Sequence, residues 1–188
     1  MVCPLWKNTE RLIAQGRFSR ERMLCFRRGM DGQPGHVHMS NREIISELTV
    51  SYEMELETVQ NYIAASVNLD GVRSDVIKKS LGADIPAEVM HAQKLAARIK
   101  TIGGLVPGSQ QFEASQNLLQ PKEDTTDVVS VIIGVIAAEE RAIEQYNKII
   151  KLCDGRDYVT QDLAIEILAD EEEHRREFVG FLKEYETP

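Results

Sequence analysis

Apolar and polar residues recur with a helical period over most of the chain from residue 40 onward. The pattern predicts four helices, over residues 40–68, 72–102, 125–152 and 157–186. A capping box that begins at Ser40 and ends at Glu43 marks the start of the first helix. Glycines that favour helix ends follow the first three helices, at Gly71, Gly103 and Gly155.

The connections between these helices predict their arrangement. Short turns make the first and second helices antiparallel, and likewise the third and fourth. Residues 103–123 have no clear period, and such a long connection lets the second and third helices run parallel. Gly82 and Pro86 lie inside the second helix, so we expect a kink there or a break into two pieces. The expected fold is all-α, a four-helix bundle of two hairpins joined by a crossover.

Two of the predicted helices carry a carboxylate in the middle of an apolar stripe. Glu55 lies on the stripe of the first helix and Glu139 on that of the third, 84 residues later. Each is followed seven residues on by a tyrosine, Tyr62 or Tyr146, on the same stripe. We expect these tyrosines to pack in the core, and one of them to contact a carboxylate or supply an electron.

The other two helices carry a matching Glu-x-x-His pattern. Glu88 and His91 lie on the second helix, and Glu171 and His174 lie 83 residues later on the fourth. Side chains three residues apart share one helix face, so each pair directs an oxygen and a nitrogen to one point. A single Glu-x-x-His pattern on a helix is common and weak evidence for a site. Here every inward Glu and His of the first hairpin has a counterpart in the second.

Four further glutamates lie off these stripes, and we expect them on a solvated face. They are Glu57, Glu140, Glu172 and Glu173.

The charge of this inward set favours metal binding. Four ionised carboxylates and two neutral imidazoles place four negative charges inside a bundle, at a cost of several kcal/mol for each unpaired ion. Two divalent cations neutralise them. Carboxylate and imidazole ligands suit iron or manganese, and a carboxylate shared by both ions can bridge them.

Composition narrows the class of protein further. The net charge is −8, which disfavours general nucleic-acid binding but suits metal cations. The uncharged apolar run of residues 128–138 is too short for a membrane span of about 20 residues. The cysteines Cys3, Cys25 and Cys153 fit neither a zinc template nor a disulfide framework, so we expect a cytoplasmic protein.

Residues 1–39 differ in charge from the rest and are expected to form a basic N-terminal extension to a domain of residues 40–188. They carry seven Lys and Arg against three acidic residues, which leaves −12 for the rest of the chain. A short amphipathic helix over residues 8–28 is the favoured interpretation. DNA binding through these basic residues is a less favoured one, and translation that starts at Met39 is a third.

From residue 40 to residue 186 the chain resembles the bacterioferritin and Dps-like branch of the ferritin-like di-iron family. The resemblance is carried by Glu55–Tyr62, by the segment from Glu88 to His91, and above all by the long segment from Asp157 to His174. It implies a di-iron ferroxidase site within one subunit. Glu55 and Glu139 would be terminal ligands, Glu88 and Glu171 bridging ligands, and His91 and His174 would each bind one iron.

The chain departs from the bacterioferritin pattern at the haem-binding position and at the C-terminal end. Bacterioferritins bind haem through a methionine directly after the second-helix glutamate, and that position is Val89 here, with Met90 about 100° further around the helix. We therefore expect no haem. Only 14 residues follow His174, which resembles twelve-subunit mini-ferritins without the fifth helix of the 24-subunit shells. We expect a homo-oligomeric cage of 12 subunits rather than 24.

The leading functional hypothesis is a ferroxidase that oxidises Fe(II) with O2 or H2O2 and deposits Fe(III) inside the cage for storage or detoxification. A second hypothesis keeps the metal pair, with manganese as an alternative to iron, but changes the reaction to that of a peroxidase, catalase or oxygenase without storage. A third is a DNA-binding, Dps-like protective protein.

Overall fold

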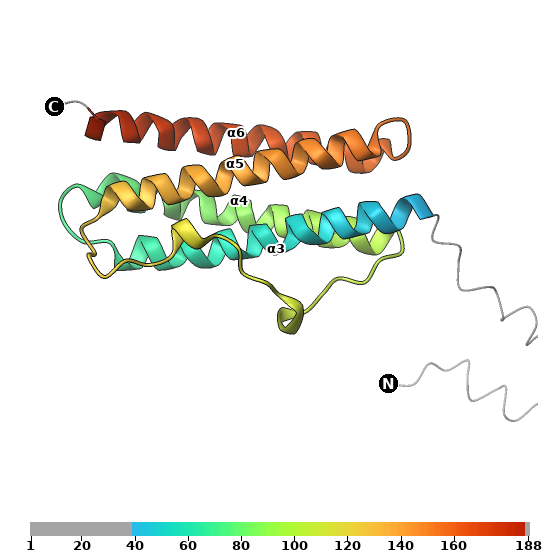
Figure 1. Cartoon of the computed structure of the whole chain (residues 1–188), viewed down its shortest axis with the longest axis horizontal. Helices are drawn as coiled ribbons and strands as arrows, with labels where there is room; N and C mark the ends of the chain where they lie inside the picture. Colours follow the sequence, from blue (N-terminus) through green and yellow to red (C-terminus); the bar gives the residue numbers. More distant parts are fainter. Residues whose placement is uncertain (1–38, 187–188) are drawn as a thin grey trace, which may run out of the picture. The chain divides into compact units, whose positions relative to one another are not determined.

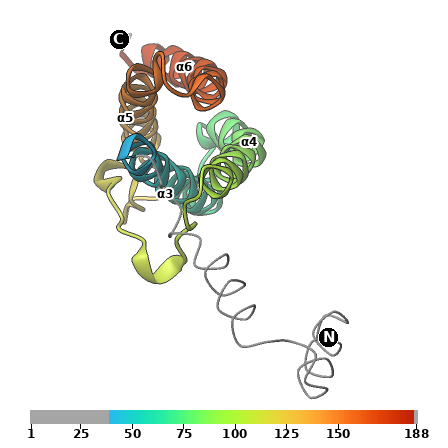
Figure 2. The same cartoon turned by 90° about the vertical axis from the view of Figure 1, so that its right-hand side faces the viewer.

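The computed structural model describes residues 39–186, which form four long helices (Figure 1). They are α3 (Met39–Asn68), α4 (Ser74–Thr101), α5 (Val128–Cys153) and α6 (Tyr158–Glu186). Seen end-on in Figure 2, they stand at the corners of a square, with α3 beside α4 and α5, and α6 beside the same two helices. The predicted bundle of two hairpins is confirmed. The basic extension was predicted over residues 1–39, and Met39 is the first residue of α3. Residues 1–38, with their interpretation as an amphipathic helix or a DNA-binding tail, lie outside the described residues.

The helix ends follow from local sequence. Gly71, Gly103 and Gly155 have positive φ angles of 90°, 92° and 66°, so each predicted glycine turns the chain at the end of a helix. Asp127 caps α5 by accepting a hydrogen bond from the Ser130 N–H at 3.0 Å. The first helix begins at Met39, so Ser40 does not precede it as the capping box predicted.

The second helix is continuous through Pro86, which excludes the predicted break into two pieces. Proline removes only one backbone hydrogen bond, the one to the carbonyl of Gly82. Packing of α4 against both α3 and α6 keeps the rest of the helix in place.

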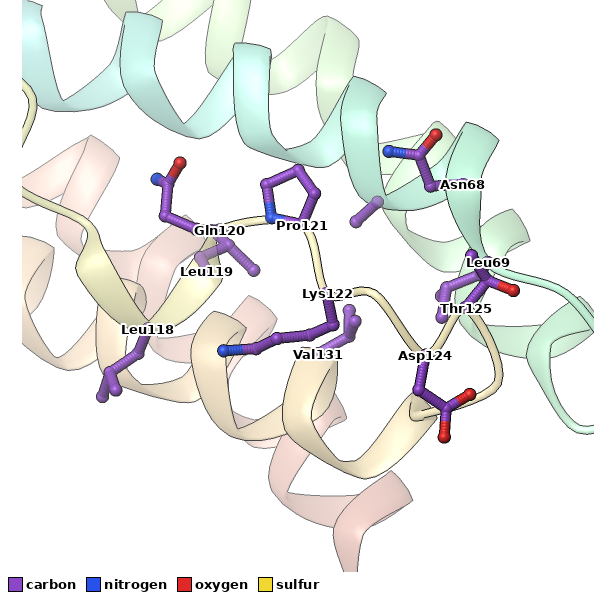
Figure 3. Close-up of a pocket in the computed structure, with 11 residues that line it drawn as sticks. Asn68, Leu69, Leu118, Leu119, Gln120, Pro121, Lys122, Asp124, Thr125 and Val131 are labelled. Atoms are coloured by element: carbon purple, nitrogen blue, oxygen red, sulfur yellow. The ribbon is translucent and has the colours of Figure 1, made fainter.

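The crossover, residues 102–127, runs back along the bundle from the end of α4 to the start of α5 (Figure 1). It contains two short 3-10 turns, Ser109–Gln111 and Asn117–Leu119. Where the second turn meets α3 and α5, a cavity of only about 20 Å³ remains among residues that include Leu69, Leu119 and Val131 (Figure 3). This is room for about one water molecule, so the crossover packs closely on the bundle at its second turn.

A buried glutamate fastens the crossover to α3, and here the sequence prediction was wrong. Glu57 was expected on a solvated face but is only 4% exposed. Its carboxylate accepts hydrogen bonds from the backbone N–H groups of Ser115 and Gln116, both at 2.7 Å, and from the Ser115 hydroxyl at 2.9 Å. The other three glutamates of that set, Glu140, Glu172 and Glu173, are exposed as predicted.

Close approach of the crossover to α5 depends on Gly134. A Cβ at this position would lie 2.7 Å from the backbone oxygen of Leu118, whereas a Cβ at Gly180 in α6 would meet nothing within 4 Å.

We therefore expect Gly134→Ala to destabilise the bundle, because the crossover backbone must move away. The matched change Gly180→Ala should stabilise it by about 0.5–1 kcal/mol, because alanine is the better helix former. Urea unfolding followed by circular dichroism measures both. Equal shifts of the same sign in the two variants would contradict this account of the crossover.

Candidate metal centre

The six inward Glu and His side chains meet in one layer across the middle of the bundle. Five of them are 1–3% exposed, and His174 is 12% exposed. Hydrophobic clusters flank this layer on both sides, one around Leu48, Leu95 and Ile149, the other around Leu81, Ile132 and Phe178. All six side chains that the sequence singled out are brought together: Glu55, Glu88, His91, Glu139, Glu171 and His174.

The ligand atoms form two overlapping groups that could hold two metal ions. Glu55 and His91 belong to the first group and Glu139 and His174 to the second, while Glu88 and Glu171 belong to both. Within each group the ligand atoms lie within 4.8 Å of one another. Two shared carboxylates between two groups make an arrangement in which neighbouring cations could be bridged.

The two shared carboxylates each present one oxygen to each imidazole. Glu88 places Oε1 3.1 Å from Nδ1 of His174 and Oε2 3.7 Å from Nδ1 of His91. Glu171 places Oε1 3.1 Å from Nδ1 of His91 and Oε2 3.3 Å from Nδ1 of His174. Despite these distances, both Nδ1 atoms and three of the four oxygens lack an aligned hydrogen-bond partner among the described residues. Buried donor atoms of this kind fit a metal ion better than they fit each other.

The tyrosines two turns away cross from one hairpin to the other. Tyr62 on α3 donates its hydroxyl proton to Oε1 of Glu139 on α5, and Tyr146 on α5 donates to Oε1 of Glu55 on α3. Burial, followed by the charge of the contacted carboxylate, raises the pKa of both tyrosines well above the usual value, so both remain donors. The sequence predicted a carboxylate contact for one tyrosine, and the structure gives it to both.

Protons hold the metal-free layer together. Burial, then repulsion by Glu171, raises the pKa of Glu55 and of Glu139 well above the ordinary range. Burial alone would lower the pKa of His174, but contacts with Glu171 and Glu88 raise it to about 11. Burial would raise the pKa of Glu88, but contacts with His174 and His91 outweigh burial and lower it to about 2. Metal ions would displace these protons on binding.

Two aspartates that the sequence reasoning missed lie on the outer side of the imidazoles. Nε2 of His91 lies 3.1 Å from Oδ2 of Asp170, within hydrogen-bonding distance. Nε2 of His174 lies 3.9 Å from Oδ1 of Asp84, a charge contact. Asp84 lies one turn before Glu88, and Asp170 directly precedes Glu171. Neither spacing reveals that each aspartate meets the imidazole of the other helix.

The residues considered for haem lie outside the layer. Val89 is half-buried, and Met90 is 52% exposed on α4.

Comparison with known proteins shows which family the chain belongs to. A family model described as a ferritin-like domain matches residues 45–187. The chain belongs to the ferritin-like family. Among curated proteins, the ferritin-like chain is similar to the bacterioferritin of Desulfovibrio desulfuricans, with 29% identity over 134 residues that cover 70% of each chain.

Solved structures share the fold of this ferritin-like protein. The bacterioferritin-related protein of Bacteroides fragilis, described as a dodecameric thioferritin, has a TM-score of 0.68 at 24% identity, covering 77% of this chain and 86% of its own. The ferritin-like, diiron-carboxylate proteins of Bacillus anthracis give a TM-score of 0.68 at 22% identity, covering 77% of this chain and 98% of theirs. Within the described part of the ferritin-like chain, no helix is both long and apolar enough to cross a membrane.

The raised pKa of His174 predicts how pH affects the metal-free protein. Because the folded state binds this proton up to about pH 11 and the unfolded state only to about pH 6.5, the free energy of unfolding should fall as pH rises between those values. Urea unfolding of chelator-treated protein from pH 6.5 to 8.5 measures the slope. Burial would lower the pKa of His91 too, but contacts with Glu171 and Glu55 outweigh burial and raise it, so two groups contribute to the slope. His174→Gln removes one of them and should make the slope shallower, and an unchanged slope in that variant would contradict the assignment.

Proposed function

We propose that this protein is a ferroxidase, which oxidises Fe(II) with O2 or H2O2 and stores or detoxifies the product as Fe(III). The observation that carries the proposal is that Glu88 and Glu171 each turn one oxygen to each of two imidazoles. A pair of substrate Fe(II) ions is the occupant that this set of oxygen and nitrogen donors suits, with Mn(II) as an alternative. The four carboxylates balance the charge of two such ions.

In this proposal each residue has a defined task. Glu55 and His91 bind one Fe(II), and Glu139 and His174 bind the other. Glu88 and Glu171 bridge the two ions. Tyr62 and Tyr146 hold the outer carboxylates in place through the crosswise hydrogen bonds.

Two adjacent Fe(II) ions supply one electron each, which with two protons reduces one H2O2 to two waters or one O2 to H2O2. The protein excludes bulk water, because the layer lies between two hydrophobic clusters. Its imidazoles give up their protons as the cations enter. The free, buried thiol of Cys153 fits a reducing cytoplasm, where we place the protein.

We further propose that the protein assembles into a homo-oligomeric cage of 12 subunits, without haem. Apolar side chains lie exposed around the turn between α3 and α4, with Val67 72%, Val72 95% and Val76 59% exposed. Exposed apolar side chains near one turn favour contacts with another chain. The similar protein of Bacteroides fragilis is described as dodecameric. Light scattering should give a mass near 12 × 21.2 kDa, and a mass near 24 × 21.2 kDa or a Soret band would contradict this part of the proposal.

Removal of one bridging charge tests the ferroxidase itself. Glu88→Gln should lower the rate of aerobic Fe(II) oxidation by more than about 100-fold, because outer partners of metal ligands alone contribute 10–100-fold. The exposed Glu172→Gln is the matched control and should keep the wild-type rate. A wild-type rate in Glu88→Gln would overturn the assignment. Steady consumption of H2O2 without iron uptake would favour a di-metal peroxidase or catalase instead.

A further inference from the structure

The two imidazoles of the centre have the same orientation relative to the bundle. Each turns Nδ1 inward to Glu88 and Glu171 and Nε2 outward to an aspartate. The aspartate comes in each case from the opposite helix, so Asp170 on α6 faces His91 on α4, and Asp84 on α4 faces His174 on α6.

The two outer aspartates, Asp84 and Asp170, are not related by the offset of the internal repeat. The 83-residue offset that relates Glu88 to Glu171 would place the counterpart of Asp170 at Ala87, which has no acceptor. Asp84 lies three residues before Ala87, nearly one helical turn earlier on the same side of α4. An aspartate therefore lies near each Nε2, although the two aspartates do not occupy equivalent positions of the internal repeat.

The chemistry of a metal-binding imidazole explains why a carboxylate belongs at this place. When Nδ1 of a histidine binds a cation, the remaining proton is on Nε2 and needs an acceptor. Asp84 is suited to accept it, since its side chain is only 12% exposed and its Oδ2 is buried with no hydrogen-bond partner in the described structure. A buried acceptor without a hydrogen-bond partner costs free energy, so a hydrogen bond to a nearby donor stabilises it.

Resting on the proposed function, we propose that Asp84 is a positioning residue that accepts the Nε2 proton of His174 and holds Nδ1 toward Glu88 and Glu171. The same arrangement makes the two metal positions unequal. His91 is 2% exposed and has its aspartate at 3.1 Å, whereas His174 is 12% exposed and has its aspartate at 3.9 Å. The position that uses His174 and Glu139 is therefore the weaker one, and it is the one that depends on Asp84.

Titration with Co(II), followed by its visible absorption, reads out each position without oxidation chemistry. The full-length wild-type protein should bind two equivalents. Asp84→Ala should weaken one of the two binding steps by about 10–100-fold and leave the other unchanged. Asp84→Asn keeps one acceptor oxygen and should weaken the same step by less, and it serves as the test if Asp84→Ala fails to fold. Asp75→Ala, an exposed aspartate of the same helix, should titrate as wild type.

A double-mutant cycle separates positioning from a general structural role. In a His174→Ala background, Asp84→Ala should change Co(II) affinity by less than about twofold, because Asp84 acts through His174. Wild-type titration of both Asp84 variants, or an equal loss with and without His174, would overturn the role of Asp84. Failure of the wild-type protein to bind two equivalents would instead overturn the proposed metal centre itself.

Discussion

A layer of four carboxylates buried in the middle of a helical bundle is the constraint on which the rest of this structure depends. Glu55, Glu88, Glu139 and Glu171 are 1–3% exposed, and hydrophobic clusters close the layer on both sides. Such charges are tolerated only with compensation. In the metal-free protein it comes from the protons of two imidazoles and two carboxyls with raised pKa, and in the proposed function from two cations. The hydrophobic clusters thus stabilise a fold whose centre is destabilising until it is neutralised.

The internal repeat explains how one layer can serve two ions. Each hairpin contributes one Glu, one Glu-x-x-His and one tyrosine, and the tyrosines bond crosswise, from Tyr62 to Glu139 and from Tyr146 to Glu55. These crossed bonds tie α3 to α5, which no short turn connects. The crossover that the topology requires is fixed in turn by Glu57, so one buried carboxylate outside the layer supports its assembly.

Much of this architecture could be predicted from the sequence because its signals are local or periodic. All four helices end within three residues of their predicted bounds, and the six inward Glu and His residues follow from stripe positions and a repeat. The side chains that were missed depend on tertiary contacts. Glu57 is polar at an outward position, and only the fold of the crossover buries it. Asp84 gains its neighbour from α6, which the spacing along α4 does not reveal. The crosswise choice of the tyrosines likewise depends on how α3 and α5 face each other.

The central claim, that this layer is a site for two cations with two shared carboxylates, is tested most directly by anomalous X-ray diffraction from crystals soaked in Mn(II). The account predicts two anomalous peaks in each chain. Both should lie within coordination distance of Glu88 and of Glu171, one beside His91 and the other beside His174. A single peak, or peaks that do not share these two carboxylates, would contradict it.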